Sequence, residues 1–221
     1  MENSMISLKC TSLGQAWTSA MEIIMRAGES IYDENVELKE IRNCYITIDN
    51  IDDLDPIIVK YADKNRVELM KKKYATCGLV GDYKIDYGSY IYDNNGINQI
   101  EWIIDRIKNK PETKSATITL HKPGEDKLAC LSMIDFKYRN NLLDMTVVYR
   151  SQNIFWSHPG NMLALRRIQN DVSEALGYDM GTMELVVISA HIYEDDYIKV
   201  NGILSQPDVQ SIIQQTTTQS N

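Results

Sequence analysis

Several features that mark whole classes of proteins are missing from this sequence. The 221 residues contain no apolar run approaching the roughly 18 to 20 residues that cross a bilayer. The first residues, MENSMISLKCTSLGQAW, lack the basic start and the continuous apolar core of a signal peptide. Internal repeats and long low-complexity segments are also absent. We therefore expect a cytoplasmic protein that has no membrane partner.

Cysteine and histidine are scarce and scattered. No two of the four cysteines have the C-x-x-C spacing of a metal site, and the three histidines do not cluster with them in the sequence. We therefore expect no bound metal, and reduced thiols. The residues are Cys10, Cys44, Cys77, Cys130, His121, His158 and His191.

Positive charge is in deficit. The chain has 31 acidic and 23 basic residues, a net charge of -8 and an isoelectric point near 4.9. A protein that binds nucleic acid without sequence preference, or lies on an anionic membrane, should be basic, so neither partner is expected. A small anionic substrate remains compatible with this balance, because a few well-placed cations outweigh a distant net charge.

The apolar content of 43% is enough for a sizeable core, and the order of elements predicts an α+β protein with one large, mostly buried sheet and helices packed on it. We expect a single domain over residues 1–221, with a mobile polar tail over about 206–221. Helices are expected over 12–27, 57–74, 96–108 and 161–176, strands over 38–49, 116–120, 127–138, 142–151 and 183–193, and a loop over 77–92.

Two of these strands should form a hairpin that brings a cysteine close to an arginine. Asn140 and Asn141 tolerate turn geometry and lie between the two strands. Cys130 opens the first strand and Arg150 ends the second. A nearby cation raises the thiolate fraction of a cysteine, so this pairing suits a nucleophile. The plainer alternatives are a buried core cysteine and a structural salt bridge.

Further polar side chains follow in the same part of the chain. The Arg150-Ser151 pair could grip a phosphate. Asn161 is expected to cap the helix that follows it, and it could still present its amide to a ligand. His191 and Tyr193 share one face of an apolar strand, either as satisfied core groups or as donors to a sugar hydroxyl. Trp156 could stack on a ring system.

Taken together, these residues resemble the thymidylate synthase family, and the likeness extends over about residues 83–197. The Cys130-Leu131 pair and the ending S-A-H-I-Y are similar to the shorter archaeal-type members. The matching positions are Tyr87-Gly88, Asn98-Gln99-Ile100, Pro111, Cys130, Arg150, Ser151, Pro159, Asn161, His191 and Tyr193.

The resemblance implies a homodimer formed through one face of the sheet, and an enzyme that transfers a one-carbon unit to C5 of a pyrimidine nucleoside monophosphate. The co-substrate would be 5,10-methylenetetrahydrofolate. Methylation of dUMP to dTMP is the first expectation. Hydroxymethylation of dCMP, CMP or dUMP, as in modified-nucleotide or nucleoside natural-product synthesis, and a nucleotide-binding homologue without catalysis are the alternatives.

The roles implied by the resemblance can be assigned residue by residue. Cys130 would attack C6 of the ring, and Asn161 would read the edge of the base. Arg150 and Ser151 would bind the phosphate, together with a Lys114 given across the dimer. His191 and Tyr193 would bind the sugar hydroxyl.

Three positions depart from the family pattern. Asn153 stands where the family has an aspartate that contacts the pterin. We expect Asn153 at the folate and in the catalytic chemistry, and Trp156 at the folate. The segment Lys114-Ser115 replaces a pair of arginines and keeps one cation without the planar fork. The catalytic glutamate of an early helix has no clear counterpart, and Glu68 is the candidate.

Overall fold

A mixed sheet organises the structure, a computed structural model that describes residues 6–122, 124 and 127–220. The strands are β1 (Ile6–Ser12), β2 (Glu29–Asp33), β3 (Val36–Asn50), β4 (Thr117–Thr119), β5 (Leu131–Arg139), β6 (Leu142–Tyr149), β7 (Gln152–Asn153), β8 (Asp179–Tyr193) and β9 (Thr217–Ser220). Within these residues they form one nine-stranded sheet in the order β4-β5-β6-β8-β3-β1-β9, with β2 beside β3 and β7 beside β8. The α+β architecture expected from the sequence is confirmed.

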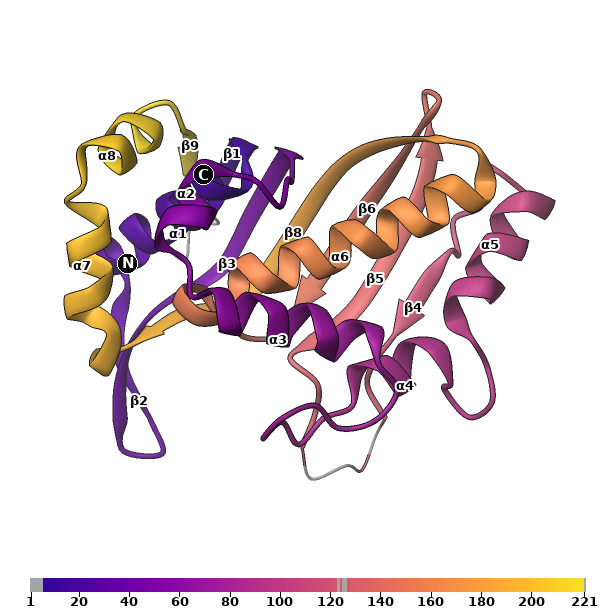
Figure 1. The fold of residues 1–221 in the computed structure, drawn as a ribbon, viewed down its shortest axis with the longest axis horizontal. Helices are drawn as coiled ribbons and strands as arrows, with labels where there is room; N and C mark the ends of the chain where they lie inside the picture. Colours follow the sequence, from indigo (N-terminus) through magenta and orange to yellow (C-terminus); the bar gives the residue numbers. More distant parts are fainter. Residues whose placement is uncertain (1–5, 123, 125–126, 221) are drawn as a thin grey trace.

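The helices cover one face of this sheet (Figure 1). They are α1 (Leu13–Ala27), α2 (Pro56–Tyr61), α3 (Lys64–Ala75), α4 (Tyr87–Tyr92), α5 (Gln99–Asn109), α6 (Ile154–Leu176), α7 (Tyr197–Leu204) and α8 (Pro207–Ile213). Under them, alternate side chains of the central strand β8 are fully buried, as Met183, Leu185 and Val187 show. Val186 and Ile188 point to the opposite face, where Val186 is half-buried and Ile188 is exposed.

The hairpin of β5 and β6 is confirmed. Asn140 and Asn141 have φ angles of 51° and 65°, in the left-handed region that asparagine tolerates and that tight hairpin turns require. Pairing then runs back to Leu131 opposite Tyr149, so that Cys130 and Arg150 lie next to each other at the end of the ladder. The expected start of α1 is also found, because the Ser12 side chain accepts a hydrogen bond from the Gln15 amide.

Three segments differ from expectation, and side-chain caps account for two of them. The helix expected over 57–74 is two helices, because Asp63 caps α3 by accepting from the Arg66 amide. The loop expected over 77–92 ends in α4, capped in the same way by Asp86. Most of the expected tail over 206–221 instead forms α8, with Val209 fully buried, and β9, which pairs with β1.

Asn161 is not a helix cap, so that expectation is wrong. Helix α6 begins at Ile154, and its cap is Asn153, whose Oδ1 accepts a hydrogen bond from the Trp156 amide at 3.0 Å. Pro159 favours a helix start in the sequence because proline is common in first turns. Here it lies inside the helix, at the expense of one backbone hydrogen bond. Asn161 is therefore an interior, buried position of α6.

Gly160 allows α3 to pack closely against α6. A Cβ atom at this position would lie 2.6 Å from Met70 Cβ, closer than real contacts permit, and 3.0 Å from the Val67 carbonyl oxygen, which is tighter than most real contacts. Only a residue without a side chain fits between the two helices at this point. The contact holds the inner side of α3, with Arg66, Met70 and Lys73, close to the residues that follow β6.

We predict that Gly160→Ala destabilises the fold, because the added methyl group meets backbone and a Cβ atom that cannot easily move. The free energy of unfolding should fall by about 1–3 kcal/mol, the usual range for overpacking. Chemical denaturation followed by circular dichroism measures this change.

Gly202→Ala is the matched control, since Gly202 lies inside α7 and a Cβ atom added there would have no neighbouring atom within 4 Å. Relief of the glycine penalty should leave this variant unchanged or more stable by up to about 1 kcal/mol. Equal stabilities for the two variants would contradict the proposed tight contact.

Candidate active site

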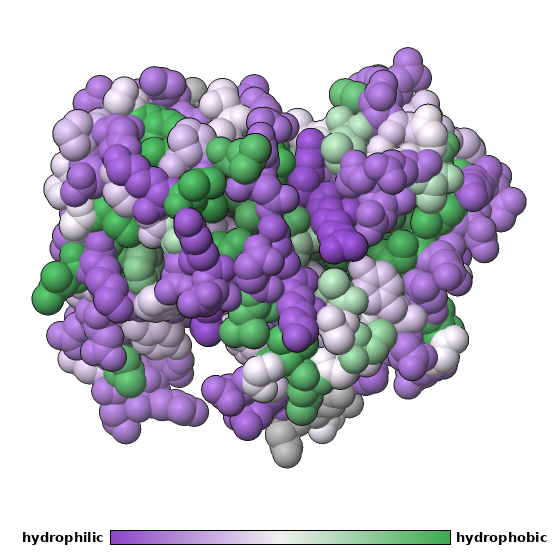
Figure 2. Space-filling view, viewed as in Figure 1, coloured by the Kyte–Doolittle hydropathy of each residue, from purple (hydrophilic) through white to green (hydrophobic). Residues whose placement is uncertain are grey.

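Cys130 opens onto a cavity of about 370 Å³ at the end of the strands β5, β6 and β8. The strand register explains why distant residues meet here: β7 pairs Asn153 with His191, while the hairpin sets Cys130 beside Arg150. The molecule is hollowed at the edge between the β2 hairpin and the loop before α4 (Figure 2). Of the residues predicted from the sequence, Cys130, Ser151, Asn153, Asn161, His191 and Tyr193 line this cavity.

The position of Cys130 is fixed by a tyrosine. The phenol oxygen of Tyr87 accepts hydrogen bonds from the backbone amides of Cys130 at 3.0 Å and Leu131 at 3.2 Å. Tyr87 is buried, and its ring packs edge-on against Tyr74 at 5.1 Å between centroids. Gly88 lets α4 lie close to the chain at Thr76, because a Cβ there would lie 2.0 Å from the Thr76 carbonyl oxygen. The thiol is therefore held at a defined point of the pocket wall.

Arg150 lies beside the thiol but does not line the cavity. Its Nη2 is 3.8 Å from Cys130 Sγ and donates at 2.9 Å to the Leu128 carbonyl, while Nε donates at 3.1 Å to the Ala129 carbonyl. The guanidinium is thus anchored by backbone oxygens, and its Nη1 makes no hydrogen bond within the described residues. The cation expected near Cys130 is present.

The pocket has two polar side chains without hydrogen bonds among the described residues and two that already have a partner. Asn161 is 6% exposed, yet neither its amide nor the Ser151 hydroxyl makes a side-chain hydrogen bond in the described part of the chain. His191 is 7% exposed, and its Nδ1 lies 3.4 Å from the Ser189 carbonyl oxygen. Burial lowers the pKa of His191, which favours its neutral form. Tyr193 donates to Asp33 Oδ2 at 3.1 Å, and burial, with that hydrogen bond, raises its pKa to about 12.

The pocket is cationic although the chain is acidic. Four basic side chains line it: Arg66, Lys73, Lys84 and Lys127. Among the described lining residues there is no aspartate or glutamate. Arg66 Nε is buried and finds no hydrogen-bond partner within the described residues. An anionic ligand would supply the negative charge and the hydrogen-bond acceptors that these cations lack.

Lys73 is the functional candidate that the sequence reasoning missed. It is 8% exposed, and its Nζ lies 3.8 Å from the ring centroid of Tyr87 and 4.0 Å from that of Tyr83. Burial lowers the pKa of Lys73 to about 8; the neighbouring Cys130 opposes this shift and Arg66 adds to it. One signal was available, because Arg66, Met70 and Lys73 recur at helical spacing on the inner side of α3.

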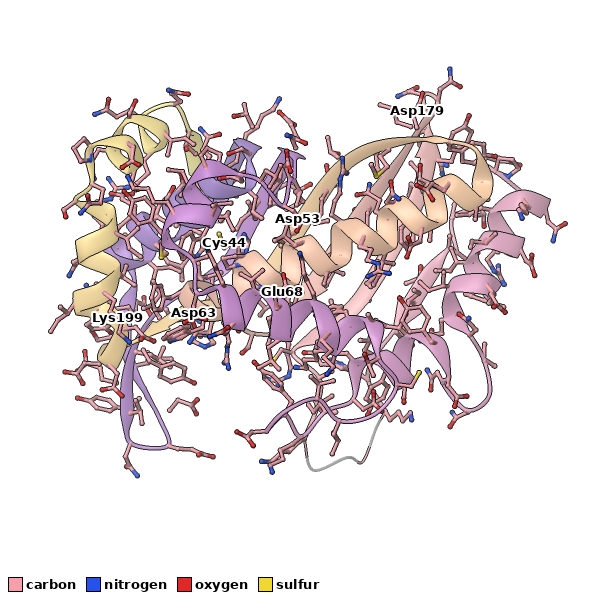
Figure 3. The ribbon with its side chains drawn as sticks, viewed as in Figure 1. Cys44, Asp53, Asp63, Glu68, Asp179 and Lys199 are labelled. Atoms are coloured by element: carbon pink, nitrogen blue, oxygen red, sulfur yellow. The ribbon has the colours of Figure 1, made fainter. Side chains whose placement is uncertain are left out.

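Glu68 and Lys114 lie outside the pocket. Glu68 is exposed on another side of α3 and forms an ion pair of 3.2 Å with Lys71, which also pairs with Asp53 at 2.6 Å (Figure 3). The structure therefore does not bring Glu68 to Cys130. Lys114 is exposed in the turn after α5.

Trp156 lies in the first turn of α6 and lines an adjoining cavity of about 630 Å³. Its Nε1 donates to Asp196 Oδ2 at 2.7 Å. Lys199 Nζ is 5.0 Å from the centroid of its ring and the Arg66 guanidinium carbon is 6.0 Å from it, so two cations flank the indole. Asn153 lines the Cys130 cavity, and its Oδ1 accepts the hydrogen bond that caps α6.

Neither a metal cluster nor a membrane-spanning helix is found in the part of the chain that the structure describes. No three His, Cys, Asp or Glu side chains of these residues gather in a way that could hold a metal ion. None of the described helices combines the length and apolar character needed for crossing a bilayer.

Comparison with known proteins gives a consistent result. A family model described as thymidylate synthase matches residues 18–218. Relatives described as "putative thymidylate synthase" include one from Methanosarcina mazei, 28% identical over 204 residues, covering 89% of this chain and 94% of the relative. One from Methanothermobacter thermautotrophicus is 27% identical over 90% of this chain and 98% of its own length. One from Methanocaldococcus jannaschii is 29% identical over 88% and 95%.

We predict that Lys73→Met stabilises the protein at pH 7. A pKa lowered from 10.5 to about 8 corresponds to a destabilisation of about 3 kcal/mol when the lysine is charged. The substitution also loses the cation–π contacts with the two tyrosines, so the gain should lie in the range of about 1–3 kcal/mol.

The gain should depend on pH. Between pH 8 and 10.5 the unfolded wild-type chain binds more protons than the folded one, so wild-type stability rises with pH across this window. The advantage of Lys73→Met should therefore shrink there, as measured by urea denaturation at several pH values. Lys72→Met is the control, because Lys72 is exposed on the same helix and should change stability by less than about 0.5 kcal/mol. A pH-independent difference would count against a strained, buried ammonium.

Proposed function

The chain belongs to the thymidylate synthase family, and we propose that it transfers a one-carbon unit to C5 of a pyrimidine nucleoside 5'-monophosphate. We favour dUMP as substrate and dTMP as product. The observation that carries the proposal is the position of Cys130, which opens onto a pocket lined by cations, an amide and a hydroxyl without partners among the described residues. This combination suits an anionic, hydrogen-bonding ring compound.

The phosphate of the nucleotide would lie near Ser151. The free Nη1 of Arg150 and the Ser151 hydroxyl can both donate to it, and charge-assisted bonds of this kind are short and strong. Arg150 keeps its orientation because backbone oxygens already hold the other side of its fork. Lys114 of a second copy of the chain would add another cation.

The base and the sugar would meet the buried polar groups. Asn161 can donate to O4 and accept from N3–H of uracil at once, and its amide can also turn to suit cytosine. Neutral His191 and protonated Tyr193 can hydrogen-bond a sugar hydroxyl. Because Asn161 and His191 are buried, a ring or sugar that left them unpaired would bind poorly.

Cys130 would act as the nucleophile. Its thiolate adds to C6 of the pyrimidine, a C6–S bond forms, and the electron pair of the C5–C6 double bond makes C5 nucleophilic. Arg150, 3.8 Å from the sulfur, favours the thiolate electrostatically. Breaking the C6–S bond at the end restores the enzyme.

The side chains around Trp156 fit a folate. The indole offers a stacking surface, while Lys199, Arg66 and the unpartnered Arg66 Nε offer cations to a carboxylate tail. When bound, 5,10-methylenetetrahydrofolate supplies the one-carbon unit and, for a methyl product, the hydride. Asn153 cannot carry the charge of the family's aspartate, and its oxygen already accepts the Trp156 amide. Its amino group and the second lone pair of its oxygen are left for a ligand.

We also propose a homodimer formed through the sheet face that the helices leave uncovered, because this face presents Val186 and Ile188 on the central strand β8. Ile188 is 45% exposed. Ile188→Lys would put a charge into such an interface and should turn a dimer into a monomer at micromolar concentration. Sedimentation velocity measures the change.

The control for the dimer test is Ile198→Lys, which places the same charge at an 87% exposed position on α7 and should leave the dimer intact. A monomeric wild-type protein, or dissociation of both variants alike, would rule out this interface.

We predict that Cys130→Ser removes catalysis. A hydroxyl is far less nucleophilic than a thiolate, so tritium release from 5-tritiated dUMP in the presence of methylenetetrahydrofolate should fall by at least about 10³-fold. The variant should also form no covalent complex with 5-fluoro-dUMP and the folate, as judged by intact mass.

Cys77→Ser is the control, because Cys77 is exposed and lies outside the pocket, so wild-type rates are expected. In the wild type, the product mass distinguishes a methyl from a hydroxymethyl group, and competition among dUMP, dCMP, UMP and CMP identifies the base and sugar. Tritium release from the serine variant at the wild-type rate would refute the assignment of Cys130.

A further inference from the structure

We infer that Lys73 is a positioning residue for Cys130, whose ammonium lies in the same cavity and stabilises the thiolate electrostatically. The inference deepens the proposed function and rests on it only for the role of Cys130 as nucleophile. It assigns a second cation to the thiolate besides Arg150, while Glu68 lies elsewhere.

Lys73 and Cys130 both contact Tyr87. Lys73 Nζ lies 3.8 Å from the centroid of the Tyr87 ring, while the phenol oxygen of the same ring accepts the backbone amide of Cys130 at 3.0 Å. Both residues line the same cavity. The Cys130 thiolate partly offsets the lowering of the Lys73 pKa by burial.

Lys73 has no carboxylate of its own within the described residues. The neighbouring Lys71, on the same helix, pairs with both Asp53 and Glu68, which is the usual arrangement for a surface lysine. Lys73 points inward and makes cation–π contacts with two aromatic rings, but it forms no ion pair or hydrogen bond with the described groups. A buried ammonium without an anion is unfavourable, so the site favours an anion that forms beside it.

Cys130 is the described group that can supply this anion. The other charged and titratable side chains that face the pair are cations, one histidine and phenols: Arg66, Lys84, Lys127, Arg150, His191, Tyr74, Tyr83, Tyr87, Tyr149 and Tyr193. Burial raises the pKa of each of these phenols, so they stay protonated near neutral pH, and it lowers the pKa of the histidine.

The charges balance as the thiolate forms. The S–H bond of Cys130 breaks, its electron pair stays on sulfur, and the proton passes to a solvent base, while the Lys73 ammonium remains in the same cavity as the new negative charge. Arg150, fixed 3.8 Å from the sulfur on the hairpin side, keeps its charge throughout. The thiolate then has a permanent cation beside it and a titratable one in the same cavity.

Alkylation of the free enzyme tests the pair without nucleotide or folate. The rate of Cys130 modification by iodoacetamide would be measured by peptide mass spectrometry from pH 5 to 10, with exposed Cys77 as an internal reference in the same sample. The Cys77 profile shows how a thiol outside the pocket reacts under the same conditions, so a change confined to Cys130 reports on the pocket.

In Lys73→Met the Cys130 profile should move up by about one unit, which makes alkylation about tenfold slower at pH 7, while the Cys77 profile stays in place. Lys72→Met removes the same charge one residue away, from an exposed position, and should leave both profiles unchanged. Denaturation curves of the same samples establish that each variant is folded. A folded Lys73→Met protein with the wild-type Cys130 profile, or an equal shift in Lys72→Met, overturns the inference.

The two proposals can fail separately. If wild-type enzyme releases tritium from dUMP but Lys73→Met leaves the alkylation profile unchanged, the reaction stands and the role of Lys73 is wrong. If the profile shifts as described but no pyrimidine nucleotide releases tritium, Lys73 does activate Cys130 and the substrate is of another class.

Discussion

The close contact of α3 with α6 at Gly160 is the constraint on which the site depends. The strands alone bring together Cys130, Ser151, Asn153, His191 and Tyr193 at one end of the sheet. These residues form one side of the cavity and leave its other side open. Because Gly160 has no side chain, α3 can pack over that open side, and its inner residues Arg66, Met70 and Lys73 close the cavity. A second contact links α3 to the end of β6: the hydroxyl groups of Tyr74 and Tyr149 form a hydrogen bond of 2.6 Å.

How much of this could be read from the sequence depends on whether a residue's neighbours are close in the chain or supplied by packing. The turn residues Asn140 and Asn141 set the register of the β5–β6 hairpin. That register determines which residues pair at its open end, so the sequence predicts that Cys130 lies near Arg150. The shared side of His191 and Tyr193 follows from the two-residue period of a strand, and their rings do meet, 5.2 Å apart. Asn161 was misplaced because Pro159 resembles a helix start, whereas α6 tolerates it in its interior.

Lys73 could not be separated from its neighbours by sequence alone. The sequence predicts that all three residues of the run Lys71-Lys72-Lys73 are exposed to solvent, because lysines at the end of a helix usually are. Which of the three turns inward is decided by the phase of α3 against α6, and that phase is set by the contact at Gly160. Glu68 was chosen by residue type and fails for the same reason, since it lies on another side of the helix, where Lys71 neutralises it.

Electrostatics in the pocket follow the burial of these few groups rather than the total charge of the chain. Exposed acidic residues are screened within about 10 Å at ordinary ionic strength, while Lys73 and Arg66 act over short distances in a site that excludes much of the solvent. A chain of net charge -8 can therefore attract an anion into this pocket. The same burial makes the ammonium of Lys73 unfavourable in the empty pocket, so any anion beside it, thiolate or phosphate, relieves part of that destabilisation on forming or binding. The buried ammonium of Lys73 destabilises the free protein, and a negative charge on Cys130 reduces that destabilisation. Lys73 therefore favours the thiolate, which is the form of Cys130 that nucleophilic addition requires.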